Sequence, residues 1–357
     1  MAPDDPNARA PVPVHGEETG GGGWMRPPRA RGLAAGLAVL TYCVVVAGSI
    51  VTSTRSGLAD RSWPLFEGSV LPSPSRMSED RGLLFEHGHR MIAGSAVALT
   101  WALAIWLLRR GAPGGIVRLA FACAAVGLVP AVLGGLTVLF AKENLPGAVS
   151  IAHVSAAMAF LSLNTALATV LGNRWARARS EVEGAGGIAE SDAKGVASGA
   201  VFCAAALYLQ AVLGAIPRHF HGGEMAHILW AFVVFTAVVL LASSAMSRFS
   251  RLPGVLGPAM ALLLLLLVQF FLGFTAYVTR PGVAKAPGSS LYEMIASAHL
   301  AVGALMLATS VVLAVRAVRI RRVAAGAAEP VSPVSSEGTS IDLLEGRALA
   351  ALPEGVS

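Results

Sequence analysis

Charged residues divide this chain into eight long apolar stretches. None of the eight contains Asp, Glu, Lys or Arg, and each is about as long as, or longer than, the roughly 20 residues that a helix needs to cross a hydrocarbon layer of about 30 Å. We therefore predict eight transmembrane helices. They cover residues 32–54, 91–108, 119–141, 144–173, 195–217, 225–247, 252–279 and 294–315.

Composition supports the membrane assignment. Hydrophobic residues make up 55% of the chain and charged residues only 13%, and the mean hydropathy is +0.65. These values are not those of a soluble globular protein. The predicted fold class is an all-α integral membrane protein.

A two-helix pattern repeats along the apolar stretches. The odd-numbered stretches carry a small-residue motif with glycine (VAGS at 46–49, VLGG at 132–135, VLGA at 212–215 and FLGF at 271–274). The even-numbered ones each have a histidine near their start, which for the second stretch lies two residues before it. Glycine in a membrane helix permits close packing of a neighbour. The repeat predicts two tandem, pseudo-symmetric four-helix bundles. The predicted bundles are residues 32–173 and 195–316, with a cytoplasmic linker at 174–194 and disordered cytoplasmic tails at 1–31 and 317–357.

The histidines of the even-numbered stretches share a local pattern. Each is followed four residues later by a small residue, which lies on the same helix face and leaves a flat patch beside the imidazole. Such a patch suits a planar ligand such as a porphyrin, and two histidine pairs would hold two hemes. A single histidine of this kind could merely hydrogen-bond a neighbouring helix, but four at matching places favour a functional site. The pairs are His89 with His153 and His227 with His299, followed by Ala93, Ala157, Ala231 and Gly303.

Basic residues gather at the ends of alternate stretches. They precede the first stretch, follow the last, and occupy the connections after the second, fourth and sixth. The excess of Lys and Arg on cytoplasmic loops then predicts that both termini are cytoplasmic and that the four histidines lie toward the extracytoplasmic side. This topology and anionic membrane lipid account for the net charge of +6, so no nucleic-acid partner is expected.

Cysteine chemistry is not indicated. Cys43, Cys123 and Cys203 fall inside predicted spans, where they are interpreted as small packing residues. The sequence has no CxxC or Cys–His zinc pattern and no glycine-rich phosphate loop. Redox chemistry would therefore require a bound cofactor.

Several segments resemble the heme A synthases. Glu-His-Gly-His-Arg at 86–90 fits the ExxHR signature of that family, and Arg-Ser-Gly-Leu at 55–58 with Trp-Pro-Leu at 63–65 is similar to its first outer loop. Gly-Gly-Leu-Thr-Val at 134–138 and Ile-Ala-His at 151–153 resemble its third and fourth helices. The likeness covers about residues 32–316, the whole predicted membrane region.

The resemblance implies oxidation of the C8 methyl group of heme O to a formyl group, which supplies heme A to terminal oxidases. It assigns a heme b cofactor to His227 and His299, the substrate heme to His89 and His153, and the chemistry to Glu86. From the residues alone, the first interpretation of Glu86 is a helix-start carboxylate or a partner for Arg90, and a catalytic base comes second.

Other residues on the histidine side complete the expected site. Arg55, Arg90, Arg218 and Arg280 are candidates for binding the heme propionates, with lipid phosphate as the competing partner. His87, His219 and His221 are interpreted as solvated loop or interfacial residues. Expected partners are heme O, a heme O synthase, oxidase assembly factors and membrane lipid, and a homo-oligomer stays open.

The chain also departs from the family pattern. Many bacterial members carry a cysteine pair in the first outer loop, and the aligned positions here hold Asp60 and Phe66. A loop disulfide is therefore impossible, which assigns the chain to a cysteine-free subset. Two other functions stay open, a membrane b-type cytochrome in quinol-linked electron transfer and a heme carrier without catalysis.

Overall fold

The fold is a set of long helices. The structure, a computed structural model, describes residues 27–60, 62–63, 74–139, 146–220, 222–280 and 289–328. Among these residues, eight helices are long and apolar enough to cross a membrane, which confirms the predicted number of spans and a multi-pass membrane protein. They are α1 (Pro28–Ser53), α3 (Arg81–Arg109), α4 (Gly114–Leu139), α5 (Pro146–Leu171), α8 (Glu190–His219), α9 (Glu224–Arg248), α10 (Pro253–Thr279) and α11 (Ser289–Ala328).

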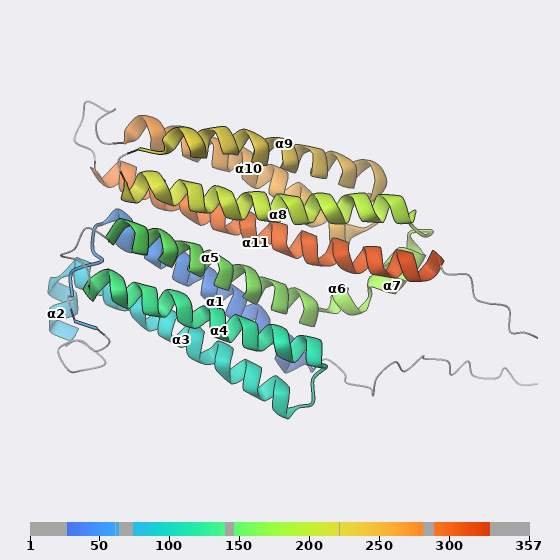
Figure 1. The fold of residues 1–357 in the computed structure, drawn as a ribbon, viewed down its shortest axis with the longest axis horizontal. Coiled ribbons are helices and arrows are strands. Elements are labelled where there is room, and N and C mark those ends of the chain that lie inside the picture. The colour runs from blue at the N-terminus through green and yellow to red at the C-terminus, as the bar shows by residue number, and fades with distance from the viewer. Residues whose placement is uncertain are drawn as a thin grey trace, which may run out of the picture.

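The long helices form two groups of four. In the first group α1 contacts α3 and α5, and α4 contacts the same two helices; in the second, α8 contacts α9 and α11, and α10 contacts the same two. The groups meet where α11 contacts α1 and α5 and where α8 contacts α5. Figure 1 accordingly shows α3 with α4 and α9 with α10 on opposite outer sides. The common order of neighbours supports the predicted pseudo-symmetry of two bundles, which itself stays a prediction. We call α1, α3, α4 and α5 the N-terminal bundle, and α8 to α11 the C-terminal bundle.

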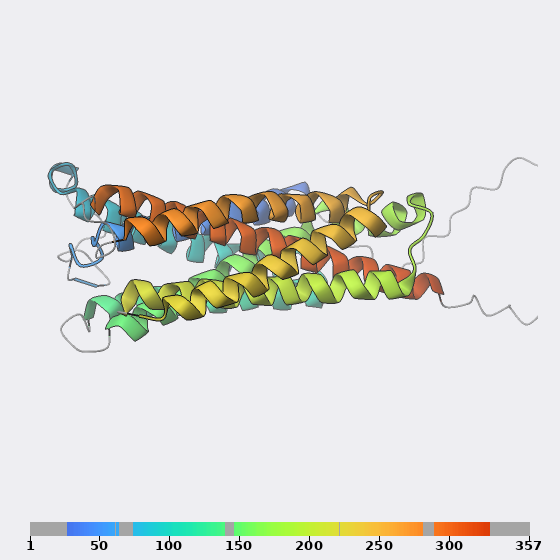
Figure 2. The ribbon, with the colours of Figure 1, turned by 90° about the horizontal axis from the view of Figure 1, so that it is seen from above.

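Both bundles run along one long axis (Figure 2). The start of α1 and the end of α11 lie at the same end of the molecule as the short helices α6 (Asn173–Ala176) and α7 (Ala178–Gly184). The short helix α2 (Pro74–Glu79) lies at the opposite end, where the four histidine-bearing helices begin. This arrangement puts all four candidate histidines toward one end of the molecule.

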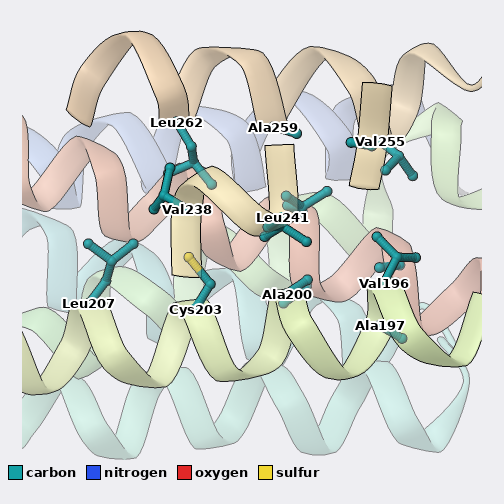
Figure 3. Close-up of a cluster of buried hydrophobic side chains, with 14 of the residues drawn as sticks. Val196, Ala197, Ala200, Cys203, Leu207, Val238, Leu241, Val255, Ala259 and Leu262 are labelled. Carbon is teal, nitrogen blue, oxygen red and sulfur yellow. The ribbon is translucent and has the colours of Figure 1, made fainter. Parts of the chain in front are cut away.

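Small and branched apolar side chains fill the space between the helices. Figure 3 shows Cys203 of α8 beside Val238 of α9 and Leu262 of α10, and the Cys203 side chain is fully buried, as is Cys123 of α4. The prediction that these two cysteines are packing residues is therefore confirmed. Cys43 is exposed on the outer face of α1, so it does not pack in the core.

The helices extend beyond the predicted spans at several boundaries. Helix α11 continues to Ala328, so residues 317–328 are helical where a disordered tail is expected, and α6 and α7 occupy much of the predicted linker. Arg and Ala have high helix propensity, and the extension has partners: Arg316 donates to the Gly254 carbonyl at 3.1 Å, and the Arg319 guanidinium lies 5.4 Å from the Trp175 ring centroid. Residues 28–31 of the predicted N-terminal tail are likewise helical, as the first turn of α1, and the tail residues before 27 and after 328 lie outside the described part of the chain.

Candidate heme sites

Each candidate histidine packs against a glycine of the preceding membrane helix. These are the glycines of the repeated small-residue motifs, and a Cβ at any of them would crowd the imidazole ring. The sequence predicts close approach at these glycines, and the structure shows that what approaches is the histidine ring. A Cβ built on the glycine would lie at 2.9 Å from His89 Cε1 for Gly48, 3.2 Å from His153 Cε1 for Gly134, 2.8 Å from His227 Cε1 for Gly214, and 2.8 Å from His299 Cε1 for Gly273.

The C-terminal bundle brings His227 and His299 face to edge across its centre. Their ring centroids are 6.1 Å apart and the ring planes make an angle of 77°. Two imidazoles that bind one metal ion from opposite sides, at about 2 Å each as in zinc sites, have centroids roughly 6 Å apart. The spacing of the two rings is therefore compatible with one metal ion held between them.

Two glutamines lie beside these histidines. Gln210 Nε2 is 3.3 Å from His227 Nε2, and Gln269 Nε2 is 3.4 Å from His299 Nε2. The His227 Nδ1 atom is 3.2 Å from the Gln210 carbonyl oxygen; if Nδ1 carries the proton, Nε2 is unprotonated, as a metal ligand must be, and in this structure its neighbour is the Gln210 amide. The Oε1 atoms of both glutamines are buried without a hydrogen-bond partner in the described part of the chain.

The N-terminal bundle places His89 on α3 and His153 on α5, the two helices diagonally opposite in that group. The His153 Nδ1 atom is 2.8 Å from the Pro130 carbonyl oxygen, again one helical turn before the glycine that faces the ring. The positions that correspond to Gln210 and Gln269 hold Val44 and Pro130. This bundle therefore has the same glycine–histidine packing without the neighbouring amides.

Glu86 is buried at the start of α3, with only 3% of its surface exposed. Its Oε1 accepts a hydrogen bond from Arg90 Nη2 at 2.5 Å, and its Oε2 accepts one from the Asp60 backbone N–H at 2.9 Å. Arg90 also forms an ion pair with Asp60 at 3.1 Å. Glu86 is thus the partner of Arg90, one of the two interpretations that the residues alone favour, and it lies one turn before His89.

The other candidate arginines differ in their surroundings. Arg218 donates from Nη2 to Ser53 Oγ at 2.5 Å, which joins α8 to α1 between the two bundles. Arg280 forms an ion pair with Glu224 at 2.7 Å and lies 4.5 Å from the Tyr277 ring centroid. Arg55 follows α1, with an exposed side chain and a φ of 56°.

The additional histidines do not all match expectation. His87 is buried, with 6% exposure, because α3 begins at Arg81 and carries His87 into its second turn; the interpretation as a solvated loop residue is wrong. His219 is the last residue of α8 and is partly buried. His221 and Phe66 lie outside the described residues.

Sequence reasoning missed four residues of these sites: Asp60, Gln210, Gln269 and Glu224. A signal for Glu224 is present, because Glu224 precedes His227 by three residues as Glu86 precedes His89. A signal for the glutamines is present too, since each lies four residues before the glycine of its motif. Asp60 lies in a loop without periodicity; the resemblance marks it only as a position where relatives carry a cysteine, and its role follows from its contacts with Glu86 and Arg90.

Comparison with known proteins adds a family to this geometry. The family of cytochrome oxidase assembly proteins matches residues 31–225, which is more than half of the chain. The chain belongs to this family. Similar proteins include heme A synthases from Rhodopseudomonas palustris (32% identical over 146 residues, 38% of this chain and 39% of the relative) and Bacillus licheniformis (32% over 120 residues, 32% and 37%).

A protoheme IX farnesyltransferase from Haloarcula marismortui is also similar, with 33% identity over 117 residues, 33% of this chain and 24% of that protein. The chain therefore matches less than two fifths of the length of each of these relatives. The matched family region contains the N-terminal bundle and continues through α8 to the start of α9.

Proposed function

We propose that this protein is a heme A synthase, which oxidises the C8 methyl group of heme O to a formyl group. The observation that carries the proposal is the repeated packing of a histidine ring on a glycine, which leaves each bundle with two helix-borne imidazoles. Membership of a cytochrome oxidase assembly family and similarity to two heme A synthases support this chemistry over other uses of heme.

We assign the heme b cofactor to His227 and His299, because their ring centroids lie 6.1 Å apart, a spacing at which both imidazoles could hold one iron. Bound there, heme b would supply one-electron redox capacity, which the side chains of this chain lack. Gln210 and Gln269 would pack beside the ligands, and Gly214 and Gly273 would keep the imidazoles close to their helices. His89 and His153 would bind the substrate heme.

Glu86 is proposed as the base that removes a proton from the substrate methyl group. A carboxylate offers about four acceptor sites, and the described contacts of Glu86 use two of them. The other sites can take a proton from a substrate held by His89, which is one helical turn away. Burial excludes water from the carboxylate, and Arg90 with the Asp60 N–H fixes its orientation.

The heme propionates would bind cations at the histidine end. Arg218 is the strongest candidate, because it lies between the bundles and its described contacts are neutral oxygens of α1. Arg90 and Arg280 already have carboxylate partners and would bind a propionate only by sharing the guanidinium, and Arg55 is exposed and equally suited to lipid phosphate. A farnesylated substrate, delivered by a heme O synthase, would enter from the bilayer between helices. The product, heme A, would be passed on to oxidase assembly factors.

We propose that the protein resides in the cell membrane with both termini in the cytoplasm and the histidine ends outside. Cysteine introduced at exposed Ser78 of α2 should then react with an impermeant thiol reagent added to intact cells, and cysteine at exposed Ser180 of α7 should not. The opposite labelling would move all four histidines to the cytoplasmic side.

Co-expression with a heme O synthase tests the function. Pigment extraction and mass analysis should find a formyl heme only when this protein is present. Quinol-dependent heme reduction without a formyl product would indicate a b-type cytochrome, and binding with release of unchanged heme would indicate a carrier. Either outcome would contradict the proposal.

A further inference from the structure

The outer loop after α1 folds around one guanidinium group. Arg90 Nη1 donates to the Ser62 carbonyl at 2.9 Å and to Asp60 Oδ2 at 3.1 Å, and Nη2 donates to the Asp60 carbonyl at 3.1 Å. Three hydrogen bonds thus run from α3 to the loop, in addition to the one to Glu86. Hydrogen bonds from a charged donor are about twice as strong as neutral ones, so this arginine anchors the loop.

Asp60 is at the centre of this anchor. Its carboxylate accepts from Arg90 through Oδ2 and from the Ser62 N–H and Oγ–H through Oδ1, at 2.8 and 2.6 Å, while its own N–H donates to Glu86. The Asp60 residue is 7% exposed. A buried carboxylate is costly unless it is paired, so the fold depends on these contacts to keep Asp60 in place.

The loop also covers the N-terminal bundle beyond Asp60. The Trp63 ring packs against Gly135 of α4, where a Cβ would clash with it, and Ser56 is buried near the start of α3. Gly134 faces His153 and Gly135 faces Trp63. Two neighbouring glycines of one motif thus leave room for the histidine ring and for the loop tryptophan. The loop therefore lies across the same bundle that holds Glu86, His89 and His153.

We propose that Asp60 is a positioning residue, which holds the loop on Arg90 and thereby fixes the orientation of the Glu86 carboxylate. Without the Asp60 charge, Arg90 loses its ion pair with the loop, and the Asp60 N–H no longer stays within reach of Glu86. Only the catalytic consequence rests on the proposed function; the anchoring of the loop does not.

The test uses a thiol probe in the purified full-length protein. Ser56→Cys places a thiol at a buried loop position, where it should react slowly with a water-soluble thiol reagent. Adding Asp60→Asn keeps an acceptor for Ser62 but removes the charge opposite Arg90. We expect the Ser56→Cys labelling rate to rise about tenfold, as loss of one hydrogen bond to a charged group implies.

The matched control is Asp192→Asn, which breaks an Asp–Arg pair with Arg248 at the other end of the molecule and should leave the labelling rate unchanged. If the Ser56→Cys labelling rate rises by less than about threefold in Asp60→Asn, or rises equally in Asp192→Asn, Asp60 does not hold the loop on Arg90. If Asp60→Asn does not assemble, Arg90→Lys replaces it, because lysine keeps the charge but cannot make the forked contacts and should also speed labelling.

Heme A formed per bound heme b is the second measurement. Asp60→Asn should lower it about tenfold while heme b content stays normal, and Asp60→Glu, which keeps the charge, should recover part of the loss. If Asp60→Asn labels fast but converts heme O normally, Asp60 holds the loop on Arg90 but does not position Glu86. If Glu86→Gln itself converts normally, the proposed function of Glu86 is wrong. The labelling result still shows whether Asp60 holds the loop on Arg90.

Discussion

The two bundles begin their first histidine helix with the same local sequence pattern and surround it differently. Glu86 precedes His89 and Glu224 precedes His227 by three residues, and each glutamate pairs with an arginine. Glu86 is 3% exposed and held by Arg90 and loop residue Asp60, whereas the Glu224 side chain is 35% exposed and pairs with Arg280 at the end of α10. The buried carboxylate is the one that we propose as a base, and the more exposed one joins the start of α9 to the end of α10.

A second difference lies one helical turn before the glycines that face the histidines. The C-terminal bundle has Gln210 and Gln269 there, with amide groups beside the imidazole Nε2 atoms, and the N-terminal bundle has Val44 and Pro130. Polar side chains beside the candidate histidines therefore distinguish the C-terminal bundle from the N-terminal one. We propose that the C-terminal bundle retains its cofactor and that the N-terminal one exchanges its substrate.

The largest expected effect separates the two histidine pairs. His227→Ala or His299→Ala should remove most of the bound low-spin heme b, because each leaves the iron without an axial ligand. His89→Ala and His153→Ala should leave heme b bound and abolish heme A formation. The optical spectrum of the purified protein measures bound heme b, and the extracted hemes show whether heme A is formed. Equal loss of heme b in all four variants would contradict the proposal that one histidine pair binds the cofactor and the other the substrate.

The next effect compares the two glutamates. Glu86→Gln keeps size and hydrogen-bonding capacity but removes the base, so heme A formed per bound heme b should fall by about 10² to 10⁴. Glu224→Gln is the matched control, since it breaks an equivalent ion pair in the other bundle and should change conversion by less than about threefold. Near-normal conversion by Glu86→Gln would show that Glu86 is only a helix-start carboxylate, and His89 and His153 would be the next residues to test for a catalytic role.

The fold was largely predictable from sequence, and the sites only in part. The eight spans follow from the lengths of uncharged stretches, which hydrocarbon thickness dictates. The extension of α11 to Ala328 was not predictable from hydropathy, because arginine-rich residues end an apolar window without ending a helix. The histidines stand out as rare ionisable residues within spans, but the Asp60–Arg90–Glu86 contacts join a loop to a helix across 30 residues and have no periodic signal.

A smaller effect should follow from filling the space beside the imidazoles. Gly214→Ala and Gly273→Ala put a Cβ 2.8 Å from His227 and His299 Cε1. Overpacking of that kind costs about 1–3 kcal/mol, which corresponds to roughly fivefold to 150-fold weaker heme b retention. Gly48→Ala and Gly134→Ala should spare heme b and weaken substrate binding. Gly134→Ala should be the mildest of the four, because its contact is 3.2 Å. Heme b retained after repeated washing measures the first pair; a loss caused equally by the second pair would contradict the comparison.

The smallest effect concerns two tyrosines that join the bundles. Tyr42 of α1 donates to the Ala301 carbonyl at 3.3 Å, two residues after His299, and Tyr208 of α8 donates to the Ser155 carbonyl at 3.0 Å, two residues after His153. Each bond thus runs from the first helix of one bundle to the last helix of the other. Each tyrosine also lies six residues before a glycine that faces a histidine.

Hydrogen bonds between membrane helices contribute about 0.6 kcal/mol on average, so Tyr42→Phe and Tyr208→Phe should each lower the unfolding temperature by about 2 °C or less. Tyr208→Phe should have the larger effect because its bond is shorter, and the exposed Tyr277, changed to Phe, serves as the control. The double variant is the informative one. If the two bonds hold a single interface between rigid bundles, the two losses should add; if breaking one lets the bundles separate locally, the second loss should be smaller than it is alone.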